Sequence, residues 1–148
     1  MKKTLKTLIS TLLLLALALC MFSCKSTDSV TPDGAQSSLW DGATYKENKE
    51  FGNGAKTLTV EVKMEDKIVT FTIKTDKDTV GEALIEHDLI AGEDSQYGLY
   101  IKSVNGVTAD FDVDQSYWAF YVNGQYAMSG VDTTAINEGD VYQLAYTK

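Results

Sequence analysis

Residues 58–73, LTVEVKMEDKIVTFTI, decide the fold of this chain, because apolar and polar residues alternate in them twice. Apolar side chains at every second position, over residues 58–64 and again over 69–73, are typical of strands with one buried face. The segment Glu65-Asp66-Lys67 between the two runs predicts a turn. The stretch therefore predicts a β-hairpin that buries one of its faces.

The hydrophobic period changes directly after this hairpin. Thr79-Val80-Gly81-Glu82 fits a capping box, in which the threonine hydroxyl and the glutamate carboxylate bind free amides of the first helical turn. We expect one helix near residues 79–89, packed across the sheet, with Gly92 soon after its end.

Strand patterns return in the second half of the chain. Asn105-Gly106 and Asn123-Gly124 predict two tight hairpin turns, and residues 131–136 predict an irregular turn or a short helical piece. Strands are expected over residues 98–104, 107–109, 117–122, 125–128 and 141–146. Two strands, one helix and then more strands are typical of an α+β fold, with the helix on one face of a mixed sheet.

The amino terminus has the three parts of a secretory signal. A basic start at Lys2, Lys3 and Lys6 is followed by an apolar run over residues 12–22 and then by a small residue before a polar segment. The apolar run is shorter than the roughly 20 residues that span a bilayer, which disfavours a retained membrane helix. We expect residues 1–23 to be a cleaved signal peptide.

Cys24 makes this signal that of a lipoprotein. Met21-Phe22-Ser23-Cys24 resembles the lipoprotein motif Leu-x-(Gly/Ala/Ser)-Cys, whose cysteine is alkylated by a diacylglyceryl group before cleavage, and departs from it at Met21. Cys20 is the weaker acceptor because bulky Leu19 precedes it. The alternative is an ordinary secreted protein that is cut nearby. We expect lipid chains such as palmitate on Cys24, which anchor the protein at the extracellular face of the cell membrane.

Composition removes several classes of function. Cys20 and Cys24 are the only cysteines, so after cleavage and acylation no disulfide, thiolate metal site or cysteine nucleophile remains. The formal net charge of −8 repels nucleic acid, whose binding depends on neutralising phosphates. No group of residues indicates acid/base or nucleophilic chemistry, so we expect no enzyme, no cofactor and no bound metal.

The chain divides into three expected parts. After the signal peptide, residues 24–56 form a lipidated flexible tether and arm, and residues 57–148 form the folded domain. The tether, to about residue 38, is rich in Ser, Thr, Asp and Gly, a linker composition. Apolar residues that follow it, such as Trp40, indicate an arm that is partly docked.

Six motifs follow one another through residues 57–148. They are Thr79-Val80-Gly81-Glu82-Ala83-Leu84, Tyr97-Gly98-Leu99-Tyr100-Ile101, Val104-Asn105-Gly106, Tyr117-Trp118-Ala119-Phe120-Tyr121-Val122-Asn123-Gly124, Gly130-Val131-Asp132 and Gly139-Asp140. Together they resemble a domain family of Gram-positive bacteria that is catalogued as a domain of unknown function. That family is similar to the carboxy-terminal domain of transcobalamin and gastric intrinsic factor.

The resemblance implies a β-grasp-like fold and a possible ligand. In the animal proteins this domain covers one side of a cobalamin, while a large helical barrel covers the other. The chain has no room for such a barrel. The resemblance therefore implies a half-site, which would bind a corrinoid weakly, rely on a partner or have lost that role.

Four tyrosines are the candidate contact residues for a ligand or partner: Tyr100, Tyr117, Tyr121 and Tyr126. Side chains in residues 117–122 alternate between two faces, and we assign the face with Trp118 to the core, so that Tyr117 and Tyr121 point outwards. Tyrosine combines a broad apolar area with a hydrogen-bonding tip, which suits recognition. The alternative is a structural role, since aromatic residues are ordinary strand formers.

Residues 110–114, Asp-Phe-Asp-Val-Asp, resemble the beginning of a calcium-binding loop. Gln115 stands where such a loop needs glycine, and Tyr121 stands where it needs a bidentate glutamate. We therefore expect a solvated acidic loop.

Two functions stay open at this point. The first is a membrane-anchored binding lipoprotein for a small ligand, with a corrinoid as the leading candidate. The second is a structural or adhesive module of the cell surface that contacts another protein or a wall polymer.

Overall fold

The computed structural model describes residues 37–148, which form one compact unit. The predicted signal peptide, the lipidation site Cys24 and the tether lie outside the described residues. Among the described residues, no helix is long and apolar enough to cross a membrane.

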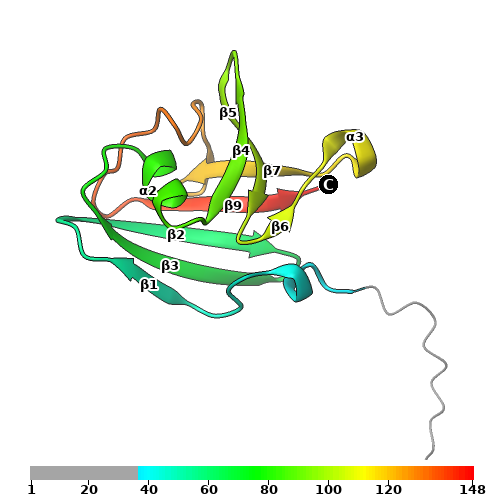
Figure 1. The fold of residues 1–148 in the computed structure, drawn as a ribbon, viewed down its shortest axis with the longest axis horizontal. Coiled ribbons are helices and arrows are strands. Elements are labelled where there is room, and N and C mark those ends of the chain that lie inside the picture. Colours follow the sequence, from blue (N-terminus) through cyan, green and yellow to red (C-terminus); the bar gives the residue numbers. More distant parts are fainter. Residues whose placement is uncertain (1–36) are drawn as a thin grey trace, which may run out of the picture. The chain divides into compact units, whose positions relative to one another are not determined.

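A six-stranded mixed sheet forms the base of the fold (Figure 1). Its strands, in spatial order, are β1 (Lys49–Gly52), β3 (Lys67–Thr75), β2 (Lys56–Met64), β9 (Val141–Thr147), β7 (Tyr117–Val122) and β8 (Gln125–Tyr126). The predicted hairpin is β2 and β3, which pair antiparallel over their full length. The last strand, β9, lies parallel to β2 at the centre of the sheet.

Helix α2 (Val80–Glu86) packs on one face of this sheet (Figure 1). The predicted capping box is present, since the Thr79 hydroxyl accepts a hydrogen bond from the Glu82 amide and the Glu82 carboxylate accepts one from the Thr79 amide. The helix ends earlier than residue 89, because the chain turns at His87 and Asp88, where Asp88 has a φ of 54°. The hairpin of β2 and β3, a helix that covers the sheet and a final strand parallel to β2 confirm the predicted α+β, β-grasp-like fold.

A second, three-stranded sheet stands against the first. It consists of β4 (Ile90–Ser95), β5 (Gly98–Val104) and β6 (Val107–Thr108). The long hairpin of β4 and β5 projects away from the six-stranded sheet (Figure 1). Strand β4 follows the expected end of the helix, at residues for which the sequence analysis predicted no strand, so the strand prediction is incomplete there.

The arm contributes to the folded unit. A 3-10 turn, η2 (Leu39–Gly42), buries Trp40, whose indole N–H donates to the Met64 carbonyl at 3.0 Å. The side chain of buried Asn105 accepts from the Tyr45 amide at 2.8 Å and donates to the Tyr45 carbonyl at 2.7 Å. The predicted turn at Asn105 thus also holds the arm, which then adds β1 to the edge of the sheet.

The core lies between the inner face of the six-stranded sheet, α2 and the second sheet. In β2, the residues Leu58, Val60, Val62 and Met64 are buried, as the alternation predicts. Strand β9 adds Tyr142 at the same face. Side chains on these strands bury one continuous apolar layer, which is the main stabilising contribution in a chain of this size.

Candidate functional site

A groove of about 470 Å³ lies between β5 and β7. The segment that follows β8, residues 127–131, closes its third side. Six of its lining residues are aromatic: Tyr97, Tyr100, Tyr117, Trp118, Phe120 and Tyr126. Ligand sites are typically concave and lined by apolar and aromatic side chains, so this groove is the candidate site.

The alternation of β7 builds the floor of the groove. Trp118 and Phe120 are buried, as predicted, and they belong to the core face of the sheet. The Trp118 indole N–H donates to the Val107 carbonyl at 3.3 Å, and the Phe120 ring stacks on the Tyr142 ring with centroids 6.3 Å apart. These contacts fix the two rings, which leaves a rigid apolar surface at the base of the groove.

The structure brings three of the four candidate tyrosines together. Tyr100, Tyr117 and Tyr126 all line the groove. Tyr121 does not line it, but lies in a separate hollow beside Gln143. The rings of Tyr121 and Tyr126 meet edge to face, with centroids 5.5 Å apart.

Two further exposed residues border the groove and escaped the sequence analysis. Tyr97 at the tip of the β4–β5 hairpin is 87% exposed, and Met128 is 100% exposed. Together with Tyr100 and Tyr126 they gather four large exposed apolar side chains at one place. Contiguous exposed apolar surface of this kind marks interaction sites in soluble domains.

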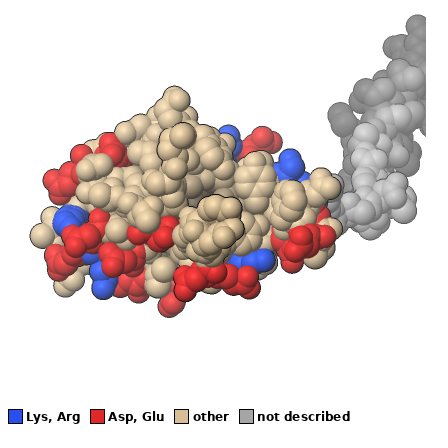
Figure 2. Space-filling model, turned by 90° about the horizontal axis from the view of Figure 1, so that it is seen from above, with Lys and Arg blue, Asp and Glu red and all other residues tan. Residues whose placement is uncertain are grey.

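The groove carries no charged lining residue, although the chain as a whole is acidic. Figure 2, which views the molecule from above Figure 1, shows a broad uncharged surface with Asp and Glu gathered along its margin. Lys102 lies nearby, with its ammonium 5.0 Å from the centroid of the Tyr100 ring. The site therefore favours an uncharged ligand surface over an ionic one.

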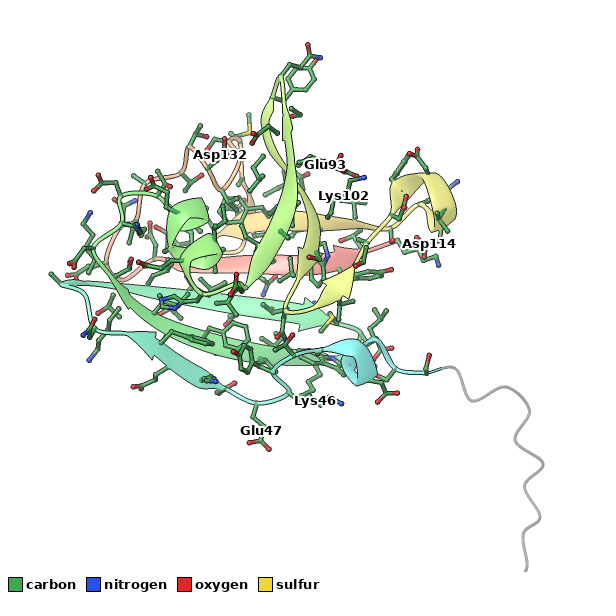
Figure 3. The ribbon with its side chains drawn as sticks, in the orientation of Figure 1. Lys46, Glu47, Glu93, Lys102, Asp114 and Asp132 are labelled. Carbon is green, nitrogen blue, oxygen red and sulfur yellow. The ribbon has the colours of Figure 1, made fainter. Side chains whose placement is uncertain are left out.

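Asp132 brings a carboxylate to the border of this groove, next to the lining residues Gly130 and Val131 (Figure 3). Its Oδ1 is buried and has no hydrogen-bond partner among the described residues. A side chain at Gly98, whose φ is +102°, would place its Cβ 2.7 Å from the other carboxylate oxygen. Because glycine has no side chain, position 98 leaves room for the carboxylate of Asp132.

Acidic side chains of residues 110–114 cap a helix and form an ion pair. Asp110 caps the short helix α3 (Phe111–Asp114), which replaces the loop that we expected. The Asp114 carboxylate accepts from the Lys148 ammonium at 2.8 Å and from Ser116, and these hydrogen bonds lower the pKa of Asp114 to about 2. Within residues 37–148, no group of three or more His, Cys, Asp or Glu side chains is arranged to hold a metal ion.

Comparison with known proteins gives one family match for this chain. Residues 77–148 match a family model described as a domain of unknown function, DUF4430, which confirms the predicted resemblance to such a family. A search of curated proteins finds no match.

The solved structures that are similar to this chain include the following two. One is a "putative metal binding protein" from Ruminococcus gnavus, with 32% identity and a TM-score of 0.60, over 64% of this chain and 98% of that one. The other is haptocorrin, of the transcobalamin family, in complex with Cbi. It has 18% identity and a TM-score of 0.49, over 66% of this chain and 26% of that one.

Proposed function

This chain belongs to the DUF4430 family, and we propose that it is a membrane-anchored extracytoplasmic lipoprotein that binds a ligand in the groove between β5 and β7. The observation that carries the proposal is the gathering of exposed Tyr97, Tyr100, Tyr126 and Met128 around one uncharged groove. Burying this apolar surface under a ligand would be favourable, at roughly 25 cal/mol for each Å² removed from water.

The ligand in this proposal is a small molecule with a broad uncharged face. A corrinoid is the first candidate, and it rests on the resemblance in sequence to the transcobalamin carboxy-terminal domain. The groove is open on one side, so it would cover one face of such a molecule. The relative from Ruminococcus gnavus is named for metal binding, yet no suitable cluster of metal ligands occurs within residues 37–148.

Titration of the purified chain in mild detergent tests this proposal. Cobinamide and cobalamin are added separately, and binding is followed by absorbance of the corrinoid and by calorimetry. We expect saturable binding of at least one of them, with a stoichiometry of one. No binding at near-millimolar ligand would contradict corrinoid binding by the single chain.

A second candidate function is contact with another protein of the cell surface. Tyr97 and Met128 favour it, because both border the groove and still leave most of their surface in water. Aromatic residues and methionine are enriched at protein interfaces. Cross-linking in intact cells through a photoreactive residue at position 97 would recover such a partner, while the same residue at exposed Glu47 serves as the control.

A further inference from the structure

Strand β7 has two unequal edges. Along one edge it pairs with β9 over all of its residues. Along the other edge it pairs with β8 at Tyr121 and Val122 alone. The second edge is the one that borders the groove, because Trp118, Phe120 and the segment after β8 line it together.

The hydrogen bonds at the end of β7 show which backbone groups face each edge. The Asn123 amide donates to the Val141 carbonyl at 2.8 Å, just before β9, and the Ala127 amide donates to the Phe120 carbonyl at 3.0 Å, on the side of the groove. Successive residues of an antiparallel strand point their amide and carbonyl groups to opposite edges. The amide and carbonyl groups of the odd-numbered residues of β7 therefore point towards β9, and those of the even-numbered residues point towards the edge that borders the groove.

Three backbone groups of β7 are consequently left free at the groove: the amide and carbonyl of Trp118 and the amide of Phe120. None of them has a hydrogen-bond partner in the part of the chain that the structure describes. An unpaired strand edge is a template for another strand, and proteins usually cover or charge it. Here the edge opens onto uncharged aromatic surface instead.

We propose that β7 takes an extended, uncharged polypeptide segment of a partner protein as an added strand. The segment would accept hydrogen bonds from the Trp118 and Phe120 amides and donate one to the Trp118 carbonyl, the mode known as β-strand addition. Its alternate side chains would lie against Tyr100 and Tyr117. A charged side chain would lose its hydration there without a counter-ion among the lining residues, so the segment is uncharged.

This inference rests on the second candidate function, contact with a surface protein, and it names how the contact is made. The test uses peptides selected from a phage-displayed library of random dodecamers against the purified chain in mild detergent. The selected peptide is then resynthesised with single N-methyl groups, which remove one peptide N–H at a time. In parallel, amide hydrogen exchange is measured by NMR with and without the peptide.

We expect a loss of affinity of about tenfold for N-methylation at every second position in the bound segment, since successive peptide N–H groups point to opposite edges of a strand and only one edge pairs with β7. Exchange of the Trp118 and Phe120 amides should slow at least about tenfold, while the Ala119 and Tyr121 amides, which already bond to β9, serve as the internal control. Failure to select any peptide, or a peptide that leaves the Trp118 and Phe120 amides unchanged, would overturn the inference. A flat corrinoid titration beside a positive peptide result would overturn only the small-ligand candidate.

Discussion

The indole N–H of Trp118 donates to the carbonyl of Val107 at 3.3 Å, and this hydrogen bond joins β7 of the large sheet to β6 of the small one. Both residues are buried. The two sheets form the two walls of the groove, so the bond ties these walls together at its floor. The width of the groove therefore depends on a buried contact between the two sheets.

Replacing Trp118 by phenylalanine should lower the free energy of unfolding by about 1–3 kcal/mol, because a buried carbonyl loses its donor. The same variant should weaken binding in the groove, since its floor and the spacing of its walls change. Chemical denaturation and ligand titration measure the two effects. Trp40→Phe is the matched control: it removes a similar bond to the Met64 carbonyl, away from the groove, and should change stability but not affinity. Equal loss of affinity in both variants would contradict this role of Trp118.

Thr79→Ala should destabilise the domain by about 1 kcal/mol, because the first turn of α2 loses its capping hydroxyl. Thr79→Ser keeps a hydroxyl in the same place and should recover most of that loss. Thermal or denaturant unfolding of the three proteins measures the difference. If the serine variant is as unstable as the alanine variant, the capping bond is not the cause.

The domain should lose stability in acid through the pair of Asp114 and Lys148. The pKa of Asp114 is lowered to about 2, chiefly by the hydrogen bond from Lys148, whereas the ordinary value is 3.8. A carboxyl whose pKa is lower in the folded state stabilises the fold above pH 3.8, and that contribution disappears as the pH falls towards 2. Asp114→Asn should therefore make the free energy of unfolding less dependent on pH across this window.

The control for this acid effect is Glu47→Gln, since the Glu47 side chain is exposed and points away from the domain (Figure 3). It should leave the pH dependence between about 4 and 2 as it is in the wild type. An identical pH profile for Asp114→Asn and the wild type would show that the pair does not contribute.

The lipid anchor is tested at Cys24. Cys24→Ala should leave an unprocessed precursor or release the protein from the membrane fraction, because acylation precedes cleavage in lipoprotein export. Metabolic labelling with a palmitate analogue and membrane fractionation follow the outcome. Cys20→Ala is the matched control and should be labelled like the wild type. Persistent labelling of Cys24→Ala would contradict the assignment of the acylated residue.

Local patterns in the sequence were enough to predict the hairpin, the helix cap and the strands β5, β7 and β9, since each has a clear hydrophobic period. Strand β4 was missed because only Ile90 at its start is buried, while the following residues are exposed and polar. Such a strand has no buried face to produce alternation. Strand β1 escaped for the same reason, as Phe51 is the only apolar side chain in it that packs on the core.

The groove was predictable only in part. Alternation within β7 predicts the face of the strand on which Tyr117 lies. The turn at Asn123-Gly124 predicts that Tyr126 lies beside β7. The contribution of Tyr97 depends on the β4–β5 hairpin, and the free edge of β7 depends on which strands lie beside it. Neighbours across a sheet are long-range relationships, and a single sequence does not show them.

The central claim is that the groove between β5 and β7 is the binding site, and paired tyrosine variants test it most directly. Affinity for cobinamide, or for a selected peptide if cobinamide does not bind, is measured by calorimetry for the wild type, Tyr126→Ala and Tyr121→Ala. These two tyrosines touch each other, yet only Tyr126 lines the groove. We expect Tyr126→Ala to weaken binding by about tenfold and Tyr121→Ala by less than about twofold. Equal losses, or a larger loss for Tyr121→Ala, would contradict the assignment of the site.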